Sequence, residues 1–197
     1  MQTTLLRTTL RALLIFVALA FVTGIVYPLA ITGLSQLIFP AQSAGSLVLA
    51  QGRILGSEII GQSFSTEKYF HGRPSAAGPD GYDASASSGS NLGPTNAKLL
   101  ESVAVNAAAI RSENGLAPDN IVPADLVTTS ASGLDPHISP ASAYLQVPRV
   151  ARARGLSEEQ VNAVVEPNVK QKWLGIFGEP RVNVLKLNLD LDNFQTS

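Results

Sequence analysis

Histidine and aspartate side chains are the residues of this chain best suited to bind a metal. His71 and His137 are its only two histidines, and a site built from them would need nearby carboxylates as further ligands. No pair among these histidines and Asp80, Asp83 and Asp135 has the helical i, i+4 spacing, and no closed set of ligands is visible. We therefore expect no metal bound by this chain.

The string Asp135-Pro136-His137-Ile138-Ser139-Pro140 contains the residue types of a hydrolase triad. A triad works only where nucleophile, base and carboxylate converge, and alternate side chains of one extended segment do not converge. We interpret the string as a proline-fixed turn leading into a capped helix. In this turn Asp135 and Ser139 would accept backbone hydrogen bonds, and His137 would donate to a carbonyl. A surface that contacts a partner is the other interpretation that we keep.

The sequence lacks the local motifs that bind or hydrolyse nucleotides. It contains no P-loop with Gly-Lys-Ser or Gly-Lys-Thr, no Gly-x-Gly-x-x-Gly fingerprint, and no Asp-Lys-Thr-Gly, the phosphorylated-aspartate signature of P-type pumps. ATP hydrolysis by this chain is therefore not expected. Because the chain has no cysteine, disulfides, thiolate zinc sites, iron–sulfur clusters and cysteine nucleophiles are excluded.

Residues 72–96 are rich in Gly, Pro and Ser, and their only apolar residues larger than alanine or proline are Tyr82 and Leu92. Such a segment cannot form its own core, and long loops in compact domains are usually functional or disordered. Aromatic residues lead into it, which predicts a loop pinned to the body of a domain. Rings and planar polar groups are typical of interface anchors, and the candidate partner-contact residues are Tyr69, Phe70, Arg73, Tyr82, Asp83, Asn91, Asn96, Asp135 and His137.

An internal role for part of this set is an equally weighted alternative. Arg73 and Asp83 carry opposite charges and both lie in the loop. An ion pair between them would staple the loop to itself instead of contacting a partner.

No charged residue occurs between Arg11 and Arg53. About 20 apolar residues in a helix span the ~30 Å hydrocarbon core of a bilayer. Residues 12–38 are therefore predicted to form one retained transmembrane helix, in preference to a buried core helix or a cleaved secretory signal. Three residues could shape this helix for packing on membrane partners, or be ordinary transmembrane composition: Gly24, Pro28 and Gly33.

The charges that flank this helix predict its orientation. Arg7 and Arg11 precede it, so the positive-inside rule places residues 1–11 in the cytoplasm and residues 39–197 outside. Beyond Arg11 the chain carries 12 Lys plus Arg (14 minus 2) against 15 Asp plus Glu, which gives no reason to expect a nucleic-acid partner. The roughly 155 residues after the anchor are enough for one domain with its own core.

Four strands are predicted in that outer domain. Apolar runs at 46–50 and 53–60, split by Gln51-Gly52, indicate either a strand pair or one bent strand. Residues 121–128 form a short strand candidate that Pro123 interrupts. The apolar and polar residues of 182–191 mostly alternate, which is typical of a half-buried strand.

Three helices are predicted between these strands. The first begins at an Asn96 or Thr95 cap and stops at Gly115. The second begins at Ser139-Pro140 and runs towards Gly155, and the third begins at a capping box of Ser157 and Gln160. Strands at both ends with helices between them indicate an α+β domain whose last strand closes a sheet.

Several longer strings occur in order along almost the whole chain: Tyr69–Gly78, Tyr82–Ala84, Ser90–Asn96, Val122–Val127, Gly133–Pro140, Arg149–Ala151 with Ala153–Leu156, and Gly178–Leu185. Together, behind one N-terminal anchor, they resemble the C subunit of Kdp-type potassium-transporting ATPases. Pro148 and the loose run at 128–132 depart from that family's pattern.

The resemblance implies a non-catalytic accessory subunit of a high-affinity, ATP-driven potassium uptake complex. Its setting would be the bacterial inner membrane, with lipid around the anchor. Its partners would be a channel-like potassium-binding subunit, a P-type ATP-hydrolysing subunit and a very small membrane peptide. ATP and potassium would bind at the level of the complex, and this chain would hold no cofactor of its own.

The family is described as a catalytic chaperone that raises the ATP affinity of the hydrolysing subunit. The flanking charges, however, place the large domain on the face opposite to ATP. We therefore expect this domain to dock on the extracytoplasmic face of the channel-like subunit near the potassium entrance and to affect ATP binding indirectly. Two other classes stay open: an anchored hydrolase that uses His137 and Ser139, and an anchored module that binds a small ligand.

Overall fold

The structure is a computed structural model that describes residues 2–50 and 52–196. The chain divides into two compact units, Met1–Leu47 and Val48–Ser197. The first unit is helical and consists of α1 (Gln2–Phe21), the π-helical turn η1 (Val22–Val26), α2 (Tyr27–Ile38) and the short α3 (Pro40–Ser43). We call the second unit the large domain.

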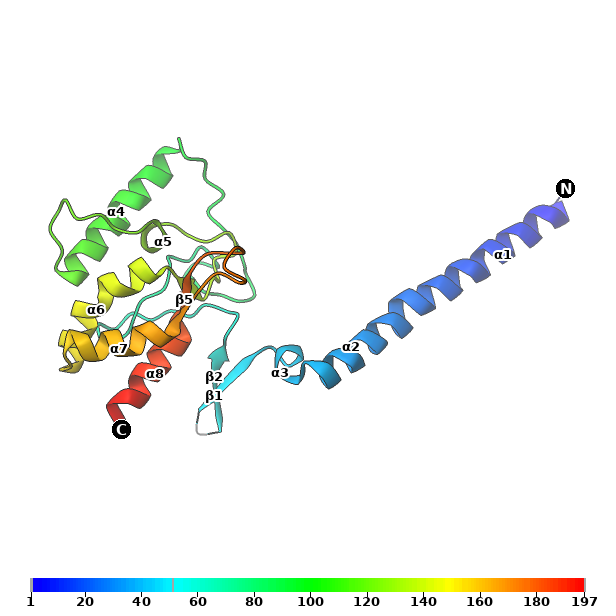
Figure 1. The fold of residues 1–197 in the computed structure, drawn as a ribbon. Helices are drawn as coiled ribbons and strands as arrows, with labels where there is room; N and C mark the ends of the chain where they lie inside the picture. Colours follow the sequence, from blue (N-terminus) through cyan, green and yellow to red (C-terminus); the bar gives the residue numbers. More distant parts are fainter. Residues whose placement is uncertain (1, 51, 197) are drawn as a thin grey trace. The chain divides into compact units, whose positions relative to one another are not determined.

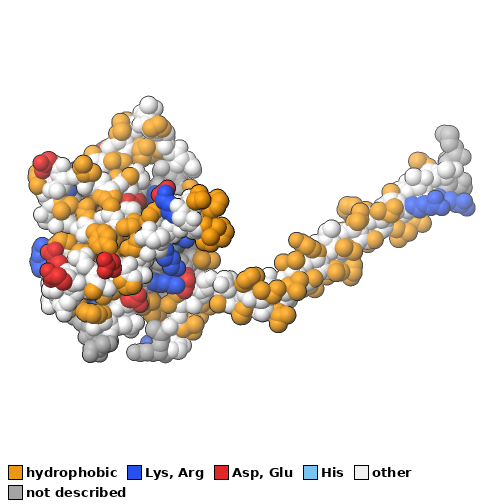
Figure 2. Space-filling model, viewed as in Figure 1, with side chains coloured by type: hydrophobic (Ala, Val, Ile, Leu, Met, Phe, Trp, Pro, Cys, Tyr) orange, Lys and Arg blue, Asp and Glu red, His pale blue; other side chains and the backbone are white. Residues whose placement is uncertain are grey.

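The first unit contains the predicted membrane helix. Thr4–Ile38 is a helical stretch of 35 residues, long and apolar enough to cross a membrane, and the mean hydropathy of its most apolar 18 residues is 2.5. Its side chains are mostly apolar and almost all exposed, with basic side chains near the N-terminal end (Figure 2). The helix begins at Gln2, so the predicted cytoplasmic tail is helical as well. The membrane boundaries stay a prediction.

A π-helical turn precedes the proline of this helix. Pro28 has no N–H to donate, and its ring would press on the carbonyl four residues earlier, that of Gly24. In η1 the N–H of Tyr27 instead bonds to the carbonyl of Val22, five residues back, which widens the turn at that point. A Cβ atom added at Gly24 or at Gly33 would meet nothing within 4 Å. Both positions are therefore open for another helix to approach.

The strands of the large domain form two small sheets. β1 (Leu47–Ala50) and β2 (Arg53–Ser57) make a two-stranded sheet, which confirms the predicted strand pair. Gly52 in the turn has a φ of +74°, and Gln51 lies outside the described residues. β3 (His137–Ile138), β5 (Arg181–Asn183) and β4 (Val169–Lys170) form an antiparallel sheet with β5 in the centre. Val182 pairs with Ile138 on one side and with Val169 on the other.

Three of the helices begin where the sequence predicts, and the first two of them also end there. α4 (Ala97–Asn114) starts at Asn96, whose side chain accepts from the Lys98 N–H, and ends at Gly115 with a left-handed φ of 66°. α6 (Pro140–Arg154) starts at the Ser139 cap. α7 (Glu158–Asn168) starts with the complete capping box of Ser157 and Gln160.

The core lies where α6, α7 and α8 (Val184–Thr196) meet β5. Each of these helices contacts β5, and α4 contacts α5 (Ala124–Val127) and α6 (Figure 1). The α+β fold class is thereby confirmed. The buried core consists of Phe70, Leu126, Ile138, Ala143, Val147, Val150, Ala151, Val161, Val164, Val165, Val182, Val184, Leu187 and Leu191.

The predicted strand at 182–191 is wrong beyond Asn183. From Val184 the chain forms α8, and the buried residues Val184, Leu187 and Leu191 have the i, i+3, i+7 spacing of one helix face. Asn183 starts this helix, because its Oδ1 accepts from the N–H of Lys186 at 3.1 Å. Such a side-chain cap favours helix over strand continuation, and alternation of leucines alone could not show it.

The predicted strand at 121–128 is also wrong. Ala124–Val127 form the single turn of α5, directly after Pro123. A proline at a helix start fixes φ at a helical value and loses no intrahelical bond. Leu126 and Val127 are buried by this turn, so the apolar residues serve the core from a helix instead of a strand.

Candidate functional site

The predicted long loop lies in a segment from residue 61 to residue 96 that contains no helix or strand. The segment is nevertheless held closely to the domain. Its contacts divide into a buried part around Phe70 and a more exposed part around Arg73 and Tyr82. These two parts contain most of the residues that the sequence singled out.

Two buried amide side chains clamp the backbone at Phe70 and His71. The N–H of Phe70 donates to Asn188 Oδ1 at 2.8 Å, and its carbonyl accepts from Asn188 Nδ2 at 3.0 Å. Gln146 does the same for His71, with bonds of 2.8 and 3.2 Å. A side-chain amide thus replaces the neighbouring strand that an extended segment would otherwise need. Phe70 itself is 0% exposed, so its side chain serves the core.

The guanidinium of Arg149 secures the residues just before this clamp. It donates to Asn114 Oδ1 at 3.1 Å, to Gln146 Oε1 at 2.7 Å and to the Tyr69 carbonyl at 3.0 Å. It also donates to the carbonyl of Glu67. Burial lowers the pKa of Arg149, but so many oxygen acceptors around a planar five-donor group keep the charge stable inside the domain.

Tyr69 lies at the edge of the same region. Its hydroxyl donates to Asp192 at 3.1 Å, and Arg154 lies 5.0 Å from the centre of its ring. Arg154 in turn donates to Asp192 and to the carbonyl of Lys68, both at 2.7 Å. Burial first, and then the Asp192 carboxylate, raise the pKa of Tyr69. The ring is therefore fixed by charges of this chain.

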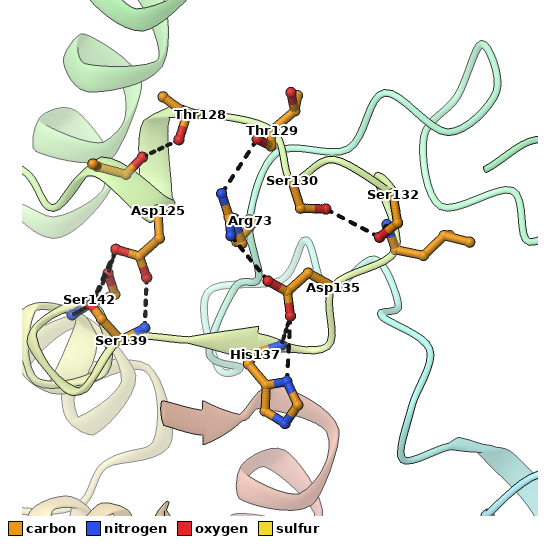
Figure 3. Close-up of polar contacts among 12 residues, drawn as sticks. Arg73, Asp125, Thr128, Thr129, Ser130, Ser132, Asp135, His137, Ser139 and Ser142 are labelled. Atoms are coloured by element: carbon orange, nitrogen blue, oxygen red, sulfur yellow. Dashed lines mark hydrogen bonds and ion pairs between the residues drawn. The ribbon is translucent and has the colours of Figure 1, made fainter. Parts of the chain in front are cut away.

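Arg73 pairs with Asp135 and not with Asp83. Its Nη1 donates to Asp135 Oδ2 at 3.0 Å, and Nη2 donates to the Thr129 carbonyl at 3.3 Å (Figure 3). The alternative prediction of an ion pair between Arg73 and Asp83 is therefore wrong. The ion pair that Arg73 makes joins the loop to the segment before β3. Asp83 is exposed and accepts from the N–H and hydroxyl of Ser85, which is a local turn contact.

The carboxylate of Asp135 connects the loop to His137. Its Oδ1 accepts from the His137 N–H at 3.0 Å and lies 3.4 Å from His137 Nδ1 (Figure 3). Burial alone would raise the pKa of Asp135, but the hydrogen bonds from His137 and Arg73 outweigh it and lower that pKa. The turn interpretation of Asp135 is confirmed. The ring of His137, which we expected to donate to a carbonyl, instead lies against this carboxylate.

Tyr82 closes the loop over Arg73. The Tyr82 hydroxyl donates to the Arg73 carbonyl, and the Tyr82 N–H donates to Ser75 Oγ at 2.7 Å. Ser75 donates to the carbonyl of Gly133 at 2.6 Å. Burial, with a smaller contribution from the Asp135 charge, raises the pKa of Tyr82 to about 12. The phenol therefore stays neutral and acts as a structural donor.

The remaining candidates lie at the outer part of the loop. Asn91 is exposed and has a φ of 52°, a left-handed conformation that asparagine tolerates better than most residues. Asn96 caps α4. Of the nine partner-contact candidates, only Phe70 is fully buried; the others keep some exposed surface that a partner could reach.

A polar cleft of about 290 Å³ lies between the loop and α4. His71 lines it, with Nδ1 3.5 Å from Glu113 and Nε2 3.1 Å from the Thr66 carbonyl. Burial, followed by the Arg149 charge, lowers the pKa of His71, so the ring holds one proton for two acceptors at neutral pH. Among the described residues no group of three His, Cys, Asp or Glu side chains could hold a metal.

The triad residue types do not converge in this structure. Ser139 Oγ lies 3.1 Å from Asp125 Oδ1 and accepts from the Ser142 N–H at 3.1 Å (Figure 3). This serine is thus the cap of α6, as the sequence predicts, with Asp125 as a further partner. Its hydroxyl is engaged away from His137.

Sequence reasoning missed the residues that hold the loop from inside. Asn114, Gln146, Arg149 and Asn188 are all buried. A signal was present on α6, where Ser142, Gln146 and Arg149 follow the i, i+4, i+7 spacing of one face. Polar residues at positions that helical periodicity assigns to the core predict a buried network.

These features describe a protein with one helix long and apolar enough to span a membrane and one α+β domain, whose long loop is held in place by buried polar side chains. The chain belongs to the KdpC family, because the model of that family, described as "K+-transporting ATPase, c chain", matches residues 9–193.

Several similar proteins match this chain over nearly its whole length and over nearly the whole of their own. One from Polaromonas naphthalenivorans is 56% identical over 92% of this chain and 92% of its own. One from Gemmatimonas aurantiaca is 54% identical over 94% and 92%, and one from Mycobacterium tuberculosis is 55% identical over 94% and 98%. Each is named "Potassium-transporting ATPase KdpC subunit".

Proposed function

We propose that this chain is a non-catalytic accessory subunit of an ATP-driven potassium uptake complex. In this proposal the large domain docks on the outer face of a channel-like subunit near the potassium entrance. The chain would also join a P-type ATP-hydrolysing subunit and a small membrane peptide. The family match and the single apolar helix support the membrane complex. The docking role is supported mainly by the loop at 72–96 and the residues that lead into it, which are held in one conformation by contacts with the domain.

That loop is a preformed surface. Its backbone is fixed by Asn188, Gln146 and Arg149 from inside and by the Arg73–Asp135 pair nearer the surface. A partner that binds a surface already fixed in this way need not order the loop, and this makes association more favourable. The exposed Asp83 and Asn91 at its outer part offer polar groups to such a partner.

Two observations argue against catalysis as the main role. The hydroxyl of Ser139 is engaged by the cap of α6 and by Asp125, and the sequence contains no motif for nucleotide hydrolysis. Any effect on ATP affinity would then pass through a shifted conformational equilibrium of the complex.

Topology is tested by cysteine labelling, which the absence of native cysteine makes clean. The variant Ser90→Cys places a thiol on the exposed loop, and Thr4→Cys places one on the predicted tail. In intact cells stripped of their outer envelope, a membrane-impermeant maleimide should label Ser90→Cys and reach Thr4→Cys only after permeabilisation. The opposite pattern would reverse the orientation and end the proposal.

Association is tested by copurification of the full-length chain in mild detergent. We expect it to carry a potassium-stimulated ATPase. The variant Asp83→Arg should reduce the recovered ATPase, whereas Glu101→Arg, on the exposed surface of α4, should leave it unchanged. A chain that purifies alone and hydrolyses a substrate through His137 would favour the hydrolase instead, and one stabilised by a small solute in the His71 cleft would favour the ligand module.

A further inference from the structure

The turn between β4 and β5 exposes four large apolar side chains in five residues. Trp173, Leu174, Ile176 and Phe177 are between 58% and 76% exposed. We call residues 173–177 the apolar turn. Figure 2 shows apolar side chains projecting at one edge of the large domain, beside basic ones. A contiguous exposed patch of this kind marks a surface that meets a protein or a membrane.

Backbone hydrogen bonds and a ring contact hold the apolar turn in a defined conformation. The Trp173 N–H donates to the Phe177 carbonyl at 2.8 Å, and the Phe177 N–H donates back at 2.9 Å. The two rings lie 5.7 Å apart. Leu174 has a φ of 52° and Gly175 has a φ of 74°, the pair of positive values that a tight hairpin turn requires. An aliphatic side chain is rare in this conformation, and such strain concentrates at functional sites.

Basic residues flank this turn on both sides. Lys170 and Arg181 are exposed where β4 and β5 pair, and Lys172 lies beside Trp173. Glu179 is the acidic residue among them and pairs with Lys172 at 3.3 Å. The flanks therefore carry three positive charges against one negative charge. Aromatic and aliphatic side chains framed by Lys and Arg are typical of segments that bind an anionic lipid surface.

The chain itself keeps the large domain near a bilayer. Between the end of α2 at Ile38 and Val48 there are ten residue steps, which reach at most about 35 Å when fully extended. A domain of this size has a radius of gyration of about 15 Å. A surface patch of the domain can therefore meet the membrane without any extra linker.

We propose that the apolar turn inserts into the interface between headgroups and acyl chains of the membrane in which the chain is anchored. Trp173 lies at headgroup depth, as the amphipathic ring of tryptophan prefers, and Phe177 lies at the boundary with the acyl chains. Leu174 and Ile176 enter the acyl region, and the flanking basic residues contact lipid phosphates. The turn thereby gives the large domain a second membrane attachment and limits its rotation about the tether. This inference needs the membrane anchor but no partner subunit.

Trp173 is the only tryptophan of the chain, so its fluorescence reports on the turn alone. The full-length protein is reconstituted by itself in vesicles of phosphatidylglycerol and phosphatidylethanolamine. A second preparation carries lipids brominated near the headgroup end of the acyl chain. We expect brominated lipids to quench Trp173 severalfold and aqueous acrylamide to quench it weakly.

Matched variants separate insertion from general effects of the vesicle. Leu174→Asp and Ile176→Asp should abolish quenching by brominated lipid and raise quenching by acrylamide severalfold. Ile121→Asp changes an equally apolar side chain that is 90% exposed elsewhere on the domain, and it should leave both values unchanged. Circular dichroism of each variant reports that the domain stays folded.

Two results overturn the proposal. One is that acrylamide strongly quenches the fluorescence of Trp173 whereas brominated lipid does not quench it. The other is a Trp173 that becomes shielded only when the potassium-stimulated ATPase is reconstituted with the chain, because the occupant of the turn is then a protein. Neither result bears on whether the chain copurifies with that ATPase.

Discussion

Asn188 offers the sharpest test of how the loop is held. In the variant Asn188→Ala the N–H and the carbonyl of Phe70 both lose their partner. Each buried peptide group left without a hydrogen bond costs about 1–3 kcal/mol. Since both groups belong to a fully buried residue, we expect the free energy of unfolding to fall by about 4 kcal/mol, twice the middle of that range.

The measurement uses the full-length chain in lipid nanodiscs. Urea unfolding followed by the near-ultraviolet circular dichroism of the tyrosines reports the free energy of unfolding of the large domain. Hydrogen exchange at the Phe70 amide reports the local effect, because that amide is protected by Asn188 itself. Since 1.4 kcal/mol corresponds to a factor of ten, exchange should accelerate by up to about a thousandfold.

Two controls separate lost hydrogen bonds from lost packing. Leu187→Ala, next to Asn188 and also buried, removes core volume and should lower stability by about 2–5 kcal/mol without a selective effect on the Phe70 amide. Asn162→Ala changes a half-buried amide of α7 and should alter stability by about 0.5 kcal/mol or less. The reasoning is refuted if Asn188→Ala costs under about 1 kcal/mol and leaves exchange at Phe70 unchanged.

Three further predictions concern the more exposed part of the loop. Because the folded pKa of Asp135 lies below its ordinary 3.8, its contribution to stability is complete above that value and is lost as the pH falls through the folded pKa. Unfolding curves of Asp135→Asn between pH 5 and pH 2 should therefore lack part of the acid-induced loss, and a variant that keeps all of it would contradict the Arg73–Asp135 contact. The pKa of Tyr82 is raised from 10.0 to about 12, so its contribution is complete below pH 10 and is lost as the pH rises through 12. Tyrosinate absorbance should show a phenol that titrates near pH 12 and is missing from Tyr82→Phe, and a Tyr82→Phe variant that keeps this phenol would rule this out. Gly133→Ala should destabilise by more than about 1 kcal/mol, because Gly133 has a φ of +68° and its Cβ would lie 2.5 Å from the Ser88 carbonyl oxygen. Limited proteolysis should then cut loop 72–96 faster, while Gly93→Ala, where a Cβ meets nothing within 4 Å, should be silent.

Local chemistry within a few residues of the sequence predicted much of the fold. The caps at Asn96, Ser139 and Ser157 depend on side chains that bond backbone groups two or three residues away. Such contacts need no tertiary information. The same holds for the apolar helix before Phe39, because its length and composition alone make it compatible with a bilayer.

Alternation of apolar residues was a weaker guide, and it failed at 182–191. Val184, Leu187 and Leu191 fit a helix face as well as their neighbours fit a strand face. The helical structure of this segment depends on the Asn183 cap and on packing against α7, which lies earlier in the chain. Short apolar runs do not distinguish the two structures by periodicity alone.

The sequence by itself determined the long apolar helix, the starts of three other helices, the family and the position of a long polar loop, since each depends on composition or on neighbouring residues. Only the tertiary structure decided how that loop is held. Arg73 meets Asp135, 62 residues away, and Phe70 meets Asn188, 118 residues away. Pairings at such separations follow from how the core packs, and a buried backbone group bonds whichever polar side chain the packed helices bring to it.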